Sequence, residues 1–111
     1  MSISNLKVID GIGINKEQDA IMLLLCDHLS WDREDSLKHS DHLLLLQKKI
    51  NAYVAFLESG QYKENYPKLE PKMAIIDIRF QYEIPDTCER FLQVVQDQIG
   101  ELGIKIEAKV G

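Results

Sequence analysis

Residues 40–60 read SDHLLLLQKKINAYVAFLESG, and this stretch decides the fold. Apolar side chains recur in it at steps of three and four residues, which places them along one stripe of an α-helix. The stripe consists of Leu43, Leu46, Ile50, Tyr53, Val54 and Leu57, and it is widened by Leu44, Leu45 and Phe56. Ser40 is the predicted N-cap, Gly60 is the predicted left-handed residue that ends the helix, and Lys49 falls outside the stripe. So apolar a helix is expected to pack against a sheet.

Two strands are predicted before this helix, at residues 6–14 and from residue 20 to about residue 29. The polar residues 15–19 separate them, which favours a hairpin. The second strand contains the run AIMLLLC, in which apolar and polar residues do not alternate. Such a run indicates burial on both faces and therefore a central place in the sheet.

The hairpin leaves two features that need a covering group. Gly11 and Gly13 make a bare notch on one face of the first strand, which we expect an aromatic ring such as Trp31 or Tyr53 to fill. Whichever face of the second strand meets the helices, apolar residues remain on the other face. The two sets are Ile21, Leu23 and Leu25, and Met22, Leu24 and Cys26. Either the loop that carries Trp31 folds over the outer set, or a partner chain or a second copy covers it.

The second half of the chain predicts a strand, a helix and a strand. Apolar and polar residues alternate over residues 72–84, as in a strand with one buried and one wet face. The wet residues are Asp77, Arg79, Gln81 and Glu83. A helix is expected from Asp86, which forms a capping-box pattern with Glu89. Its stripe consists of Phe91, Leu92, Val95, Ile99 and Leu102. Gly103 ends this helix, and residues 104–110 form the last strand.

The predicted order is therefore ββαβαβ in an α+β fold. Two helices with one apolar stripe each suit a two-layer α/β sandwich, in which a mixed four-stranded sheet carries both helices on one face. A split, ferredoxin-like arrangement of the same elements is the alternative. The 111 residues suit a single domain, 1–111.

Composition narrows the classes of partner. The formal net charge of −5 argues against sequence-independent binding of nucleic acid and permits a basic protein partner. Cys26 and Cys88 both lie in apolar surroundings, which is typical of free thiols in a reducing cytoplasm. The N-terminal residues lack a signal-peptide pattern, and the apolar run 20–26 is too short to cross a bilayer. We expect a cytoplasmic protein without a membrane partner.

The side chains with the most chemistry gather between residues 27 and 42: Asp27, His28, Asp32, Asp35, His39, Asp41 and His42. On a helix, His39 and His42 would share a face and, with Asp27 or Asp32, could bind a metal. His28 or His42, next to a carboxylate, could instead transfer protons. The spacing matches no zinc-protease pattern, and the chain has no nucleophile elbow. We therefore assign no catalytic residue, cofactor or metal. A hydrolase or metal-dependent enzyme that uses Asp27, His28, His39 and His42 is kept as an alternative.

Trp31 is the one tryptophan, and acidic residues surround it in the sequence. An aromatic anchor ringed by acids is typical of a hot spot for a basic partner. The predicted partner-binding residues are Trp31, Asp32, Glu34, Asp35, His39, Asp41, Tyr62 and Tyr66. The opposing interpretation is that Trp31 closes the core and the acids are ordinary surface. The leading hypothesis is an acidic protein-interaction module, with an immunity- or antitoxin-like inhibitor of a basic toxin as one form. A homodimeric structural protein is a further alternative.

Three stretches carry a resemblance: residues 25–32 (LCDHLSWD), 42–51 (HLLLLQKKIN) and 58–60 (ESG). They resemble a family of small bacterial proteins of unknown function, over most of the chain. The most specific part is the Asp-His-Leu-x-Trp segment that leads into the His-Leu-Leu-Leu-Leu-Gln helix. The resemblance implies a bacterial, intracellular protein, and it carries no known activity or catalytic residues.

Overall fold

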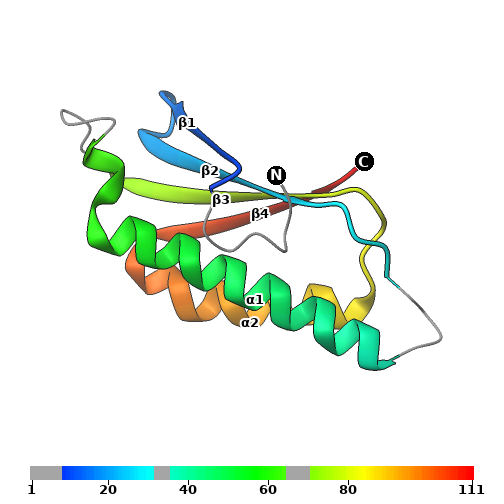
Figure 1. Ribbon diagram of the computed structural model, residues 1–111. Helices are drawn as coiled ribbons and strands as arrows, with labels where there is room; N and C mark the ends of the chain where they lie inside the picture. Colours follow the sequence, from blue (N-terminus) through cyan, green and yellow to red (C-terminus); the bar gives the residue numbers. More distant parts are fainter. Residues whose placement is uncertain (1–8, 32–35, 65–70) are drawn as a thin grey trace.

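The computed structural model describes residues 9–31, 36–64 and 71–111, which form a two-layer α+β fold. A four-stranded sheet with the strand order β1-β2-β3-β4 makes one layer, and both helices lie on the same face of it (Figure 1). The elements are β1 (Gly11–Asn15), β2 (Ala20–Asp27), α1 (Ser36–Ser59), η1 (Gln61–Glu64), β3 (Met73–Phe80), α2 (Asp86–Ile99), η2 (Gly100–Leu102) and β4 (Ile104–Val110). This confirms the predicted order and the mixed sheet.

The hairpin forms because the turn between β1 and β2 is stabilised by a side chain. The two strands pair antiparallel, with Ile12 opposite Leu23. The side-chain oxygen of Asn15 accepts hydrogen bonds from the backbone N–H groups of Glu17 (3.1 Å) and Gln18 (3.2 Å). This is the turn-forming bond that asparagine makes readily, and it fixes the register of the hairpin.

The remaining strands are parallel, and the helices are their crossover connections. β2 pairs with β3, and β3 pairs with β4. Because β2 and β3 run in the same direction, the loops that follow them meet at one edge of the sheet. The backbone N–H of Gln81, just beyond β3, donates to the carbonyl of Asp27 at the end of β2 over 2.9 Å. This carboxyl edge brings together the sequence around Trp31 and the sequence around Tyr82.

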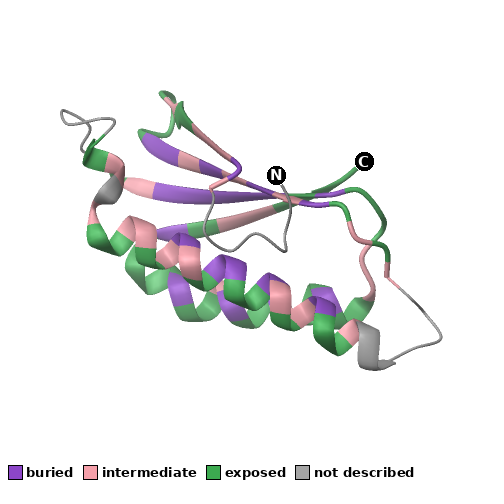
Figure 2. Ribbon diagram, in the orientation of Figure 1, coloured by how far each residue is buried: buried purple, intermediate pink, exposed green. Residues whose placement is uncertain are grey.

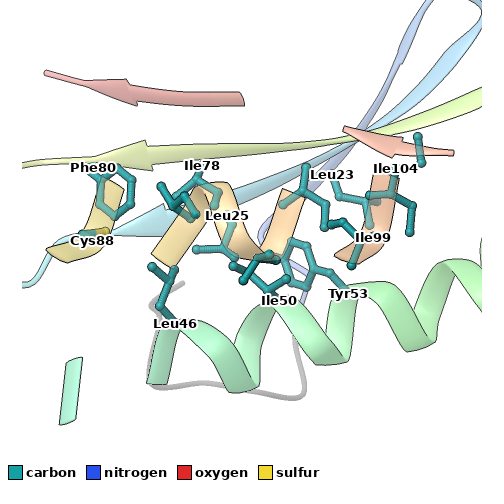
Figure 3. Packing of buried hydrophobic residues seen from close by; sticks show 14 of the residues in the cluster. Leu23, Leu25, Leu46, Ile50, Tyr53, Ile78, Phe80, Cys88, Ile99 and Ile104 are labelled. Atoms are coloured by element: carbon teal, nitrogen blue, oxygen red, sulfur yellow. The ribbon is translucent and has the colours of Figure 1, made fainter. Parts of the chain in front are cut away.

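The core lies between the sheet and the two helices, where the buried residues gather (Figure 2). Alternate residues of the strands face it, and the helices cover them with the stripe that each presents (Figure 3). The largest contributions come from Leu23, Leu25, Ile76, Ile78 and Phe80 of the sheet, Leu46, Ile50 and Tyr53 of α1, and Cys88, Leu92 and Ile99 of α2.

Helix α1 differs from the prediction at its start and on its surface. It begins at Ser36, so Ser40 lies inside the helix and does not cap it. Lys49, which the spacing placed outside the stripe, is fully buried, whereas Leu44 is 48% exposed. The buried face therefore centres on Leu46, Lys49, Ile50 and Tyr53 and excludes Leu44. Gly60 does adopt the left-handed conformation, with a φ of 74°.

Helix α2 also begins differently from the predicted capping box. Its N-cap is Pro85, whose carbonyl accepts from the N–H groups of Cys88 and Glu89, and no side chain caps the helix. Asp86 and Glu89 nevertheless lie in the first turn, where negative charge is favourable. The regular helix ends at Ile99, so Leu102 belongs to η2 and is 54% exposed instead of joining the stripe.

Candidate functional site

A buried aspartate and a buried histidine meet where β2 ends, beneath the first turns of α1. Asp27 is 1% exposed and His42 is 5% exposed. The imidazole Nε2 lies 2.5 Å from Oδ2 of Asp27 and donates to it, since an ionised carboxylate only accepts. The other carboxylate oxygen accepts from the backbone N–H of Leu29 at 3.0 Å. Both oxygens are therefore used, and the orientation of the imidazole is fixed.

Trp31 rests on this histidine. The rings of Trp31 and His42 are stacked, with centroids 3.6 Å apart and an interplanar angle of 15°. His39 meets the indole edge-on at 5.8 Å, and Phe80 lies 6.5 Å away at a tilt. Aromatic contacts of this kind contribute about 1 kcal/mol each beyond the area they bury. The indole is thus held from three sides by rings that themselves belong to α1 and β3.

A hollow opens beside Trp31 at the carboxyl edge of the parallel strands. It has a volume of about 260 Å³. We call it the Trp31 hollow, and its lining residues are Ser30, Trp31, Tyr82, Glu83, Ile84 and Pro85. Tyr82 is 46% exposed and Glu83 is also exposed. Among the described lining residues, the hollow thus combines apolar and aromatic walls with the carboxylate of Glu83, which suits a side chain that has an apolar stem and a positive end.

The structure brings together only some of the predicted partner-binding residues. Trp31 and His39 are in contact, and Asp41 is exposed on the second turn of α1. Tyr62 lies in η1, beyond the far end of α1, which has 24 residues and therefore a length of about 36 Å. Tyr62 packs against the core there and does not extend the surface around Trp31. Asp32, Glu34, Asp35 and Tyr66 lie outside the described residues.

The residues of the alternative enzyme site are only partly assembled. Asp27 and His42 meet, but His28 is exposed, and His39 contacts the indole of Trp31. Within residues 9–31, 36–64 and 71–111, no group of three His, Cys, Asp or Glu side chains is placed to hold a metal ion. His42 is buried against Trp31, and its Nε2 is committed to Asp27. This geometry suits holding the indole in place.

A second buried polar network lies midway along α1, and sequence reasoning missed it. Lys49 Nζ is 3.4 Å from Oδ1 of Asp10, and Oδ2 of Asp10 accepts from the backbone N–H of Cys26 at 2.8 Å. The hydroxyl of Tyr53 accepts from the N–H of Asp10 and donates to the carbonyl of Leu24 at 2.6 Å. Burial, the largest cause, raises the pKa of Tyr53 well above its ordinary value.

The spacing of residues in α1 could have predicted this network. Lys49 follows Leu46 by three residues and precedes Tyr53 by four, so it belongs to the buried face by helical geometry. In the predicted strand 6–14, the alternate positions from residue 6 are apolar except for Asp10. Two charges that interrupt apolar patterns indicate a buried ion pair, because neither is stable in the core alone.

The face of the sheet away from the helices differs from three expectations. Trp31 contacts His42 and Phe80 on the helix side, so the indole itself does not cover the outer residues of β2. The notch at Gly11 holds no aromatic ring: a Cβ there would lie 3.3 Å from that of Leu24, which fills it. Asp77, predicted to be wet, is 4% exposed. The outer side chains of β2 and β3 are therefore more buried than the alternation of apolar and polar residues in the sequence predicts.

Fold and site together define a class: a small acidic α+β domain with an aromatic hollow at the carboxyl edge of its parallel strands. The chain belongs to a family described as a family of unknown function (DUF6572), whose model matches residues 1–111. This agrees with the expected membership of an uncharacterised family. No curated protein and no solved structure matches the chain significantly. In the part of the chain that the structure describes, no helix is both long and apolar enough to cross a membrane.

Proposed function

We propose that this protein is a small acidic protein-interaction module that binds a basic partner protein at the Trp31 hollow. The observation that carries the proposal is the indole of Trp31, stacked at 3.6 Å on His42 and lining an open hollow. Binding energy in protein interfaces concentrates on a few well-held tryptophan, tyrosine and arginine side chains. An anchor that is already fixed loses little conformational entropy on binding.

The charge of the hollow points to the chemistry of the partner. Glu83 is its charged lining residue, and the exposed Asp86 and Glu89 follow on the first turn of α2. A lysine or arginine side chain would lay its stem on Trp31 and Tyr82 and pair its charge with Glu83. The net charge of −5 would also speed the encounter with a basic protein.

An immunity- or antitoxin-like inhibitor is the form of this module that we favour. Such a protein would act by occluding the functional surface of a basic toxin in a bacterial cytoplasm. Small size, acidic charge and a preformed aromatic anchor support it. The expected genetic context is a neighbouring reading frame that encodes a basic, toxic protein. Co-expression of this chain should suppress that toxicity.

The test is a pull-down from bacterial lysate with three baits: the wild type, Glu83→Lys and Glu101→Lys. Both substitutions change the net charge equally, but Glu101 is exposed in η2, outside the hollow. We expect a basic protein that the wild type and Glu101→Lys retain and that Glu83→Lys loses by tenfold or more. Equal recovery of every protein by all three baits would reject the Trp31 hollow as the binding surface.

A fourth bait tests the aromatic wall of the hollow. Tyr82→Ala removes an exposed ring from the wall of the hollow and leaves the stack of Trp31 on His42 in place. Recovery of the same partner should fall several-fold, because truncation of an aromatic contact in an interface commonly costs 1 kcal/mol or more. Unchanged recovery would show that the ring of Tyr82 is not part of the binding surface.

A further inference from the structure

A second hollow lies on the outer face of the sheet, on the side opposite the helices. It has a volume of about 520 Å³ and lies between Gly13 of β1, Met22, Leu24 and Cys26 of β2, and Asp77 and Arg79 of β3. We call it the outer hollow. Its walls are mainly apolar, with one acid and one base, which is the usual composition of a site for a small organic molecule.

The acid at the outer hollow is incompletely paired. Asp77 is 4% exposed, and its Oδ2 accepts from Nε (3.2 Å) and Nη2 (3.1 Å) of Arg79. Its Oδ1 is buried and, among the residues that the structure describes, has no hydrogen-bond partner. An unpaired buried carboxylate oxygen is costly, and most such groups in native proteins are satisfied by something. Within residues 9–31, 36–64 and 71–111, this carboxylate oxygen can therefore still accept a hydrogen bond.

The base supplies the complementary groups. The side chain of Arg79 is 56% exposed, and a guanidinium carries five N–H donors, of which Asp77 takes two. The pair thus offers an acceptor and free donors next to each other. Rotation about the Cβ–Cγ bond of an aspartate is soft, so either carboxylate oxygen can turn towards a ligand.

Gly13 keeps the hollow open. A Cβ at this position would meet nothing within 4 Å, whereas a Cβ at Gly11 would press on Leu24 at 3.3 Å. The backbone of Gly13 is not in the left-handed region, so its conformation does not require glycine. The missing side chain at Gly13 therefore leaves space. Glycine within a strand often marks a close approach by another molecule.

We propose that the outer hollow binds an uncharged apolar molecule that carries one secondary amide. The amide N–H would donate to Asp77, its carbonyl would accept from Arg79, and its hydrocarbon part would pack on Met22 and Leu24. A charged ligand would face either Asp77 or Arg79 with the wrong sign. This site is on the opposite face from the Trp31 hollow and does not depend on the proposed function.

The test uses two matched probes, N-methylhexanamide and N,N-dimethylhexanamide, titrated into the full ¹⁵N-labelled chain and followed by backbone amide shifts of β1 and β2. Only the first probe has an N–H. We expect it to bind about tenfold more tightly, which is the effect of one hydrogen bond to a charged acceptor. Equal affinities, or no saturable shift with either probe, would overturn the proposal.

A variant pair locates the site. Gly13→Val fills the open space on the outer face and should abolish the shifts without lowering the melting temperature. Ile14→Val alters the next residue, whose side chain lies on the other face of β1, and should bind the probe as the wild type does. Wild-type affinity in Gly13→Val would overturn the site. So would a stable dimer in sedimentation that Gly13→Val dissociates, because a second copy would then occupy the hollow.

Discussion

Helix α1 covers two buried polar networks, one at its middle and one near its start, and they differ in how completely they close. In the middle network, Asp10 and Tyr53 satisfy each other and also satisfy backbone groups of β2. In the network near the start, Asp27 is fully used, but Nε1 of Trp31 and Nε2 of His39 are buried without a partner among the described residues. This second network borders the Trp31 hollow.

The difference separates a structural role from a functional one. A buried network whose groups are all paired stabilises one packing of the chain and offers nothing to a ligand. A network with unpaired polar groups and an exposed edge is less stable, and a ligand could satisfy those groups. Substitutions in the middle network should therefore act on stability, and substitutions around the Trp31 hollow should act mainly on binding.

The largest expected effect is that of Lys49→Met. It leaves the carboxylate of Asp10 buried without its ammonium partner, which costs about 4 kcal/mol. Urea unfolding at neutral pH measures the loss. The control is Lys48→Met, which changes an exposed neighbour and should stay within about 0.5 kcal/mol of the wild type. A loss below about 1 kcal/mol in Lys49→Met would mean that this network does not stabilise the fold.

His42→Ala should cost about 2 kcal/mol, because Oδ2 of Asp27 loses its donor. The change also removes the ring on which the one tryptophan stacks, so the emission maximum of Trp31 should shift to longer wavelength. His28→Ala, at an exposed position, is the control and should change neither quantity. An unaltered emission maximum in His42→Ala would show that the stack does not hold the indole.

Cys88 tests how well the core at the start of α2 excludes water. Burial, with help from Asp27 and Glu89, raises the pKa of the Cys88 thiol from 9.0 to about 12. Between these values the unfolded chain ionises this thiol and the folded chain does not, so the unfolded chain binds fewer protons. Stability should therefore fall as the pH rises from 9 to 12, by up to about 1.4 kcal/mol per pH unit from this group.

Cys88→Ala removes the contribution of this thiol to the pH dependence of stability and leaves the contributions of the other titratable groups. Urea unfolding at several alkaline pH values should give a shallower loss of stability for the variant than for the wild type. Equal slopes would indicate a hydrated thiol. The core around Cys88 would then be less well packed than the core around Tyr53.

The smallest effect on stability is expected from Tyr82→Ala. Its ring is half exposed at the rim of the Trp31 hollow, so the free energy of unfolding should change by about 0.5 kcal/mol or less. The same variant is expected to lose most of its partner binding. A stability loss of about 2 kcal/mol or more would show that Tyr82 supports the fold, and the separation of the two roles would then fail at this residue.

Local patterns predicted the elements well and their ends less well. The alternation in β3 and the stripe of α2 identified most of the inward-facing residues, because burial of apolar area dominates those choices. The start of α1 was placed four residues late, since a good capping residue at Ser40 is also acceptable inside a helix. The capping box at Asp86 was wrong because the carbonyl of Pro85 receives the first N–H groups instead.

The candidate site was only half visible in the sequence. Trp31 and His42 were singled out by their neighbours along the chain. The contribution of Tyr82, Glu83 and Pro85 was not, because they lie some fifty residues away and reach Trp31 only through the parallel pairing of β2 with β3. No local pattern records which strand lies beside which.

The sequence by itself determined the order of the elements, their apolar faces and the acidic character of the protein, because periodicity, turn chemistry and charge are local properties. The tertiary structure alone decided that Lys49 is buried against Asp10, that Trp31 lies on the helix side of the sheet, and that Asp77 and Gly13 border one hollow. These facts depend on contacts between residues distant in the chain. Such contacts are selected by the packing of the whole core and not by any single segment.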